Sequence, residues 1–422
     1  IVQIGRAAQR VPIYLESFQV RRAQFYGSQG HSGHANFPNV IRLMAAGLVD
    51  MTQAITARYD LESVVKAIQQ STARRDGKIM VKMPAGGGRT MRTQETMLAA
   101  LKRVPLPTIQ RPDEVLLRVE GAGICGTDGH ILEVPPGHPA TPGTILGHEY
   151  LGRVVEIGSA VSHFQVGDRV VIAPNLYCGL CRYCREGRPN QCEDFTTLGI
   201  YLHGGFAEYN VAPERALFHL AEDVSVEDAV FTELLSCVVG GTSKVKAQPG
   251  EQVAILGAGP VGLMFAVFFR AAGAGRIILS DLAPYRLRLA QEAGFEVVNA
   301  QQRDAVAYIR SRMGGGADIV VDAVGALFAQ AIEAAAVGGR VVLFGMNQQA
   351  RPAVSQYDIT RKDLTVYGTF IGINTFPTAI KMLESGVLKP SLFLTHKLPL
   401  AEIEKGFAAM RSGEAVKVLI VP

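Results

Sequence analysis

The stretch that decides the fold is an apolar run followed by a glycine-rich turn, Gln252-Val-Ala-Ile-Leu256 and then Gly257-Ala258-Gly259-Pro260-Val261-Gly262. A long apolar segment follows, so the order predicts a strand, a turn and a helix. In such a unit the first glycine permits the turn, the second lets backbone approach a pyrophosphate, and the third packs helix against strand. The helix N-terminus offers free N–H groups to phosphates. We expect Gly257, Gly259, Pro260, Val261 and Gly262 to bind a dinucleotide; a simple tight turn is the alternative.

Asp281 ends the next predicted strand and suits the ribose end of a dinucleotide. A carboxylate at this place bonds the adenosine ribose hydroxyls and repels a 2′-phosphate, which favours NAD over NADP. Arg286 lies five residues further on and weakens that preference. The alternative is that Asp281 only caps a helix.

On the two sides of this turn, the chain shows two different patterns of predicted secondary structure. Downstream, strands alternate with helical stretches, which predicts a doubly wound parallel sheet in an α/β protein. Its predicted strands are Gln252–Leu256, Arg276–Ser280, Asp318–Asp322, Arg340–Phe344 and Leu364–Tyr367. Upstream, short β-branched strands are expected at Glu114–Val119, Gly152–Ile157 and Arg169–Ile172.

Composition excludes several classes of partner. The chain has 422 residues, 48% of them hydrophobic and 19% charged, and a formal net charge of +4. With no long basic run, nucleic acid and anionic membranes are not indicated. The uncharged run at 253–269 is marginal for spanning a membrane and contains several glycines and a proline. We see no signal peptide and expect a soluble, cytoplasmic protein.

Four of the six cysteines are clustered, at Cys178, Cys181, Cys184 and Cys192. Clustering in a large chain favours metal over disulfides, and four thiolates suit a closed, structural zinc site. A zinc ribbon that binds nucleic acid is the alternative, but the neighbouring Arg182, Arg185 and Arg188 are too few to favour it.

A second set mixes ligand types, in Cys125-Gly126-Thr127-Asp128-Gly129-His130 and Gly147-His148-Glu149. A thiolate, an imidazole and a carboxylate leave a coordination position open, as a catalytic zinc needs in order to polarise an alcohol. Spacing alone does not show that Cys125 and His148 meet, because a lone cysteine or histidine is more often a core residue.

The chain also contains a partial internal repeat. Residues 1–83 match the C-terminal segment in order, with Gly47, Thr56, Leu61, Lys66 and Lys78 opposite Gly386, Thr395, Leu400, Lys405 and Lys417. We interpret 1–83 as the C-terminal remnant of an upstream copy, either a tandem fusion or a truncated copy. Residues 84–96, which include a glycine run, are expected to be a linker.

Five motifs stand in one order: the Cys125–His130 segment, Gly147-His148-Glu149, Gly167-Asp168-Arg169-Val170, the four-cysteine segment and the Gly257–Gly262 turn. From about Met91 to Pro422 this order resembles the zinc-containing medium-chain dehydrogenase/reductase superfamily. The resemblance implies a mostly-β, GroES-like catalytic domain at 97–246 with 370–422, and an NAD-binding Rossmann domain at 247–369. It also implies two zinc ions per active unit and a homo-oligomer, either a dimer or a tetramer.

The resemblance further implies roles for individual residues. Cys125, His148 and Glu149 would be catalytic zinc ligands or close neighbours, and Glu233 in Glu233-Leu234-Leu235-Ser236 a further ligand beside the metal. Thr127 would take the substrate proton and His130 would relay it to solvent. Relatives that act on polyols usually place His or Asn where this chain has Gly240, so the contact there is open.

The expected function is oxidation of a secondary alcohol (a polyol, cyclitol, sugar or hydroxy-amino acid) with transfer of hydride to NAD. The presence of Glu233, with no third cysteine ligand at its position, favours these over simple primary alcohols. A threonine 3-dehydrogenase-like activity is the alternative enzyme. A dehydrogenase fold kept as a silent structural or regulatory protein is the non-enzymatic alternative.

Overall fold

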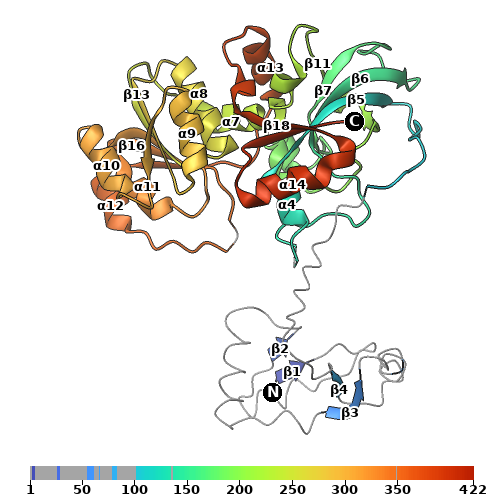
Figure 1. Cartoon of the computed structure of the whole chain (residues 1–422), viewed down its shortest axis with the longest axis horizontal. Coiled ribbons are helices and arrows are strands. Elements are labelled where there is room, and N and C mark those ends of the chain that lie inside the picture. Colours follow the sequence, from blue (N-terminus) through green and yellow to red (C-terminus); the bar gives the residue numbers. More distant parts are fainter. Residues whose placement is uncertain are drawn as a thin grey trace. The chain divides into compact units, whose positions relative to one another are not determined.

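The computed structural model describes residues 101–422 apart from Pro135 and Gln348, together with Lys66 and four short strands near the N-terminus. The chain forms two compact units, Ile1–Arg92 and Thr93–Pro422 (Figure 1). The linker predicted at 84–96 lies outside the described residues.

A six-stranded parallel sheet forms one half of the larger unit, in the order β14-β13-β12-β15-β16-β17. Its strands are β12 (Gln252–Leu256), β13 (Arg276–Asp281), β14 (Glu296–Asn299), β15 (Ala317–Asp322), β16 (Ala335–Leu343) and β17 (Thr365–Gly368). Its helices are α8 (Pro260–Ala271), α9 (Pro284–Glu292), α10 (Ala305–Arg312), α11 (Phe328–Ala334) and α12 (Gln356–Arg361). The order reverses between β12 and β15, which is the switch point where doubly wound sheets bind ligands.

Helices cover both faces of this sheet because β12 is apolar at every buried position. Val253 and Ile255 pack in one core cluster with Leu263 of α8, whereas Ala254 and Leu256 belong to a second. Successive side chains of a strand point to opposite faces, so a continuous apolar strand needs cover on both sides (Figure 1). The uncharged run at 253–269 is thus β12, its turn and most of α8, and no helix among the described residues is long and apolar enough to span a membrane.

A mostly antiparallel seven-stranded sheet forms the other half, in the order β11-β7-β6-β5-β19-β18 with β10 also paired to β5. Its strands are β5 (Glu114–Ile124), β6 (Glu149–Ile157), β7 (Arg169–Ile172), β10 (Tyr209–Pro213), β11 (Leu217–His219), β18 (Leu394–Pro399) and β19 (Lys417–Val421). A separate two-stranded ribbon contains β8 (Asn175–Leu176) and β9 (Thr196–Thr197). The C-terminal strands therefore complete a sheet that begins near residue 114.

Short helices surround this second sheet. They are α4 (Gly126–Ile131), α5 (Arg182–Arg185), α6 (Val226–Ala229), α13 (Phe376–Glu384) and α14 (Ile403–Ser412), with 3-10 turns η3 (Pro189–Gln191), η4 (Glu214–Ala216), η5 (Pro390–Phe393) and η6 (Leu400–Glu402).

One longer helix, α7 (Thr232–Val245), lies between the two sheets (Figure 1). It contacts β6 on one side and both α8 and β16 on the other. Its buried Leu235 and Val238 share one hydrophobic cluster with Leu151 of β6 and Ile255 of β12. A single core therefore joins the two halves and holds the buried face of α7 in place.

The described residues of the smaller unit form two pairs of parallel strands. β1 (Val2–Ile4) pairs with β2 (Tyr26–Ser28), and β3 (Ile55–Asp60) pairs with β4 (Lys78–Lys82). In the second pair the register shifts between Ile55 and Ala57. The pair β18–β19 of the larger unit shifts between Leu394 and His396. The two pairs therefore have equivalent registers, and in each the register shifts at the equivalent place near the start of the first strand.

Candidate active site and metal centres

The first candidate metal centre forms where two neighbouring strands meet. β5 runs up to Ile124, and Cys125 is the N-cap residue of α4. β6 begins at Glu149, which pairs with Gly123 of β5, so His148 and Glu149 lie beside Cys125. One potential ligand atom from each of Cys125, His148 and Glu149 lies within 4.8 Å of the others. This pairing brings together the three residues that the sequence left apart.

Asp128 lies against two members of this cluster, and its role is one that sequence reasoning missed. Its Oδ2 accepts a hydrogen bond from the Cys125 N–H at 2.9 Å, and its Oδ1 lies 3.5 Å from Nδ1 of His148. Carboxylates that orient a metal-binding histidine in this way are common. Asp128 is fully buried, which gives its charge a strong effect on the cluster. The sequence signal that could have identified Asp128 is its position, because it is a carboxylate three residues after Cys125.

The charges around the cluster favour a cation. Burial alone would lower the pKa of His148, but the negative charges of Asp128 and Cys125 outweigh it and hold that pKa well above its ordinary value. Both Asp128 Oδ1 and His148 Nδ1 are buried without a hydrogen-bond partner. A thiolate, an imidazole and a carboxylate form a ligand set suited to zinc with an open position. The donor set and its excess negative charge therefore fit a bound zinc ion.

Lys417 forms a buried ion pair with one member of the cluster. Its Nζ contacts Oε2 of Glu149, and the two residues are each 1% exposed. Burial lowers the pKa of Lys417, but Glu149 and Cys125 raise it by more, so the lysine carries its charge. A Cβ at position 123 would lie 2.6 Å from Oε2 of Glu149, so Gly123 leaves the room for this pair.

Glu233 lies close to this cluster but outside it. The carboxylate stands in the first turn of α7 and accepts a hydrogen bond from the Cys237 thiol at 3.4 Å. Burial raises the pKa of Glu233, and the charge of Glu149 adds to that effect while His148 opposes it. The structure thus brings together three of the four residues expected at this metal and places the fourth as their neighbour.

The two residues expected to move a proton lie on α4. Thr127 is half-buried, two residues after Cys125. His130 is exposed, and its Nδ1 bonds with Oε1 of Glu133 at 2.8 Å. Residues three apart on a helix are neighbours, so Thr127 and His130 lie next to each other, one half-buried and the other at the surface.

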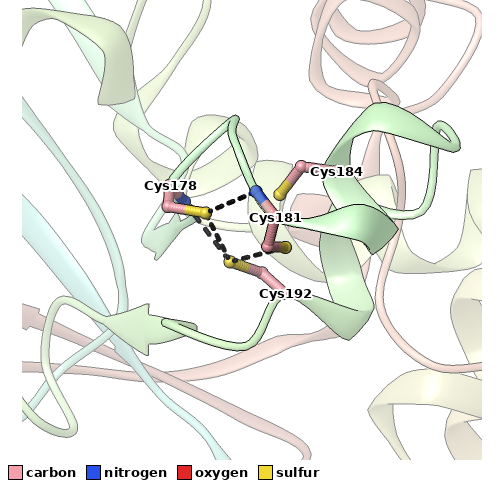
Figure 2. Close-up of side chains that lie close together, drawn as sticks. All are labelled: Cys178, Cys181, Cys184 and Cys192. Carbon is pink, nitrogen blue, oxygen red and sulfur yellow. Dashed lines mark hydrogen bonds between the residues drawn. The ribbon is translucent and has the colours of Figure 1, made fainter.

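The four-cysteine segment forms the second candidate metal centre (Figure 2). The four sulfur atoms lie within 4.8 Å of one another, with 3.5 Å between Cys178 and Cys192 and 3.9 Å between Cys181 and Cys192. Tetrahedral zinc with Zn–S of about 2.3 Å requires sulfurs roughly 3.8 Å apart. No cysteine in the described part of the chain forms a disulfide. The spacing therefore fits a closed four-sulfur zinc site.

Backbone N–H groups around this site stabilise negative sulfur. Hydrogen bonds from the backbone of Cys184 and Glu193 lower the pKa of Cys181 to about 6. The N–H groups of Leu180 and Asp194 point at Cys178 and Cys192 from 3.4 and 3.3 Å. The neighbouring Arg182 and Arg188 both form ion pairs with Glu186.

We expect Cys181→Ser to remove one of two zinc ions per chain. Three thiolates and a hydroxyl bind zinc far less well than four thiolates, because the soft sulfur ligands define this type of site. Metal content measured by plasma mass spectrometry should fall from two equivalents to one, and the segment 178–192 should become sensitive to protease. A content that stays at two would contradict the assignment.

The glycine-rich turn adopts the form that its residues predict. Gly257 has φ of +106°, a conformation that glycine reaches without strain. A Cβ at position 262 would lie 1.9 Å from the carbonyl oxygen of Gly257, so only glycine allows this contact of helix and turn. Gly259 is the N-cap of α8, and Pro260 is its first residue. Free N–H groups at this helix start thus face the switch point of the sheet.

Asp281 and Arg286 both lie beside this turn. Asp281 Oδ2 accepts a hydrogen bond from the Ala258 N–H at 2.7 Å, and Oδ1 accepts one from Ala283 at 2.8 Å. The carboxylate therefore supports the turn, and α9 has Ala283 rather than Asp281 as its N-cap. Nη1 of Arg286 lies 4.0 Å from Oδ2 of Asp281. The buried Nε of Arg286 has no hydrogen-bond partner.

Gly240 packs against backbone rather than opening a space. A Cβ there would lie 2.9 Å from Cα of Gly372. The loop that precedes α13 therefore fills the space beside position 240.

The comparisons with known proteins agree with this geometry. Residues 111–222 match the family "Alcohol dehydrogenase GroES-like domain", and residues 260–385 match "Zinc-binding dehydrogenase". The chain belongs to the zinc-containing medium-chain dehydrogenase/reductase superfamily.

Two curated relatives and one solved structure illustrate the likeness. Sorbitol dehydrogenase of Bacillus subtilis is 32% identical over 76% of this chain and 94% of its own. L-threonine 3-dehydrogenase of Bacillus velezensis is 35% identical over 77% of this chain and 95% of its own. The structure of a zinc-binding dehydrogenase from Sinorhizobium meliloti bound to NADP has a TM-score of 0.72, with 34% identity over 76% of this chain and 94% of that chain.

Proposed function

We propose that the protein oxidises a secondary alcohol (a polyol, cyclitol, sugar or hydroxy-amino acid) and transfers its hydride to NAD. The observation that carries this proposal is the convergence of Cys125, His148 and Glu149 on one point. Relatives named for sorbitol and for threonine support the substrate class. The three residues are proposed as ligands of the catalytic zinc, with Glu233 beside them.

The catalytic zinc would supply Lewis acidity, which lowers the pKa of a hydroxyl group at the open position. Asp128 accepts a hydrogen bond from the Cys125 N–H, and its Oδ1 faces His148 Nδ1 at 3.5 Å, so it would help to position both ligands. Lys417 balances part of the negative charge through Glu149. Cys178, Cys181, Cys184 and Cys192 would hold the structural zinc.

The Gly257–Gly262 turn would hold the dinucleotide, which accepts the hydride when bound. The helix start at Pro260 would face the pyrophosphate, and Asp281, which lies beside the turn, would bond a ribose hydroxyl. We propose NAD over NADP because a carboxylate here repels a 2′-phosphate. Arg286 is the opposing influence, since an arginine can bind that phosphate.

Thr127 and His130 would carry the proton released from the substrate hydroxyl to water. Thr127 accepts the proton at Oγ1 and passes on its own to His130. With Nδ1 of His130 engaged by Glu133, Nε2 is the nitrogen free to receive it.

We expect His130→Ala to lower kcat by about tenfold near neutral pH, because a positioned proton carrier accelerates transfer and exposed water replaces it only in part. Added imidazole should restore part of the loss in the steady-state assay. His138→Ala, a half-buried histidine outside the relay, is the matched control. An unchanged kcat across the pH range would remove His130 from the relay.

The test of the function is turnover by the full-length, zinc-loaded protein. Sorbitol, other polyols, 2,3-butanediol and L-threonine would each be offered with NAD and with NADP, and reduced nicotinamide would be followed by absorbance. A polyol preference supports the main proposal, and a threonine preference supports the alternative enzyme. Normal NAD binding without turnover of any alcohol would favour a silent structural or regulatory protein. A chelator should abolish any activity that depends on zinc.

We propose that residues 1–83 are the C-terminal remnant of a second dehydrogenase copy, joined by a linker at 84–96. The common register of β3–β4 and β18–β19, with its shift at the equivalent residue, supports this. For the active unit we propose a GroES-like catalytic domain at 97–246 with 370–422 and a Rossmann domain at 247–369.

The active unit should work alone, so expression of Met91–Pro422 should retain the specific activity.

We also propose a homo-oligomer in the cytoplasm. β17 forms an edge of the parallel sheet, and such edges pair readily with a second copy. Clustered thiols without a disulfide favour a reducing compartment. Light scattering of the purified protein would distinguish a dimer from a tetramer.

A further inference from the structure

A loop lies between the two binding regions that we propose for the larger unit. It consists of residues 369–375 and begins where β17 ends, at Gly368. The carboxyl ends of the strands in a doubly wound sheet border the ligand site, so the loop starts at the edge where we propose the dinucleotide. It then packs against the first two turns of α7, where a Cβ at Gly372 would lie 2.5 Å from the carbonyl oxygen of Ser236.

The same loop is connected to the neighbourhood of the metal cluster. The backbone of Gly372 forms a hydrogen bond with the thiol of Cys237, and that thiol donates to Oε1 of Glu233 at 3.4 Å. Glu233 is the carboxylate that we place beside the catalytic metal. A cavity of about 210 Å³ adjoins this place, with Ser236 and residues 371–376 in its walls. The loop therefore borders both halves of the proposed active site.

The backbone of the loop adopts conformations that need support from neighbouring groups. Ile371 has φ of +57°, and Asn374 has φ of +54°. A β-branched residue rarely has a positive φ, because its Cβ then crowds the backbone. Such residues keep this conformation only where the surrounding contacts hold them. The loop thus depends on its contacts to stay in place.

Two of these contacts come from the four-cysteine lobe, by which we mean residues 178–195. Asn190 lies in the turn η3, between the third and the fourth cysteine, and its Nδ2 donates to the carbonyl oxygen of Phe370 at 2.7 Å. The rings of Phe195 and Phe370 lie side by side, with centroids 6.4 Å apart. Asn190 and Phe195 also line the cavity that the loop borders. Because cysteines flank η3 on both sides, the fold of the lobe determines where Asn190 lies.

We propose that Asn190 is a positioning residue, through which the four-cysteine lobe holds the 369–375 loop in the conformation that binds ligands. The fold of the lobe therefore sets the affinity of the active site. Without the bond from Asn190, fewer molecules hold the loop ready, and the apparent affinity falls by that fraction. The inference rests on the proposed function only for the identity of the two ligands.

The decisive variant is Asn190→Asp, which keeps the size of the side chain but replaces the donor by an acceptor facing the carbonyl oxygen of Phe370. In the full-length, zinc-loaded protein, amide hydrogen exchange within 369–375 should become about tenfold faster. Calorimetric titration with NAD should give a Kd about fivefold higher. KM for the alcohol should rise by a similar factor while kcat changes by less than about twofold, because the bound ligands then hold the loop.

Gln191→Glu is the matched control for this variant. Gln191 is exposed in the same turn, and its replacement introduces the same charge without removing the bond to Phe370. Phe195→Leu is a second variant, which removes the ring contact and keeps the hydrogen bond. It should change the exchange rate and the Kd in the same direction as Asn190→Asp. All three variants should retain two zinc ions.

A double replacement tests the connection with the four cysteines. Cys181→Ser should raise the Kd of NAD about fivefold, because a disordered lobe no longer places Asn190 against the loop. Asn190→Asp in that background should add less than about twofold, since both changes remove the same contact.

Three results would overturn the proposal. The first is an unchanged exchange rate and Kd in Asn190→Asp, and the second is an equal loss in Gln191→Glu. The third is full additivity of Asn190→Asp and Cys181→Ser, because the lobe would then act by another route. If no alcohol is turned over but the exchange rate and the Kd respond as described, the proposed function fails and the inference stands. If the unaltered protein does not bind NAD, the proposed function fails, and the exchange rate still decides whether Asn190 holds the loop.

Discussion

Replacing Cys125 by serine should lower kcat/KM by about 10³-fold. The thiolate is one of three ligand atoms that lie within 4.8 Å of one another, and the loss of one leaves an incomplete set. Lewis-acid stabilisation of the developing charge is worth several kcal/mol, and about 4 kcal/mol corresponds to that factor. The steady-state rate with the preferred alcohol would measure the loss.

Two further measurements separate catalysis from folding in this variant. Dinucleotide affinity should change by less than about twofold, because the Gly257–Gly262 turn lies on the other sheet. Zinc content should fall from two equivalents to one. Cys237→Ala is the matched control, since its thiol bonds Glu233 but lies outside the cluster, and it should keep two zinc ions. Full activity in Cys125→Ser would rule out this cluster as the catalytic centre.

Replacing Lys417 by methionine should destabilise the larger unit by about 3–5 kcal/mol. Methionine has a side chain of similar length to lysine but carries no charge, so Glu149 stays buried without its partner. Removing one member of a buried ion pair has a cost of this size. The loss should be greater in the metal-stripped protein, because zinc offers the carboxylate a second positive partner. Chemical denaturation followed by circular dichroism would measure both states.

A double replacement distinguishes charge from packing. Glu149→Gln combined with Lys417→Met removes both charges, so it should recover part of the stability lost in Lys417→Met alone. Lys397→Met is the matched control, because Lys397 is exposed and pairs with Glu227 at the surface, where such pairs contribute about 1 kcal/mol or less. Equal losses for Lys397→Met and Lys417→Met would show that burial of the pair does not matter.

The regular elements of the dinucleotide half could be predicted because their signals are local. The strand expected at Gln252–Leu256 has those bounds in the structure, and Asp318–Asp322 begins one residue earlier, at Ala317. β14, at Glu296–Asn299, was not predicted. It is a short edge strand with mostly half-buried side chains, so its pattern resembles that of a loop.

The sequence by itself determined the kinds of chemistry in this chain. Ligand types, the spacing of four cysteines and the glycine turn are properties of neighbouring residues, and they predicted membership of the dehydrogenase superfamily that the comparisons confirmed.

Only the tertiary structure decided which side chains meet. Strand pairing joins Gly123 to Glu149 and brings Lys417 from a distant part of the sequence against that carboxylate. Such contacts depend on register and on packing between distant segments, for which no local pattern exists.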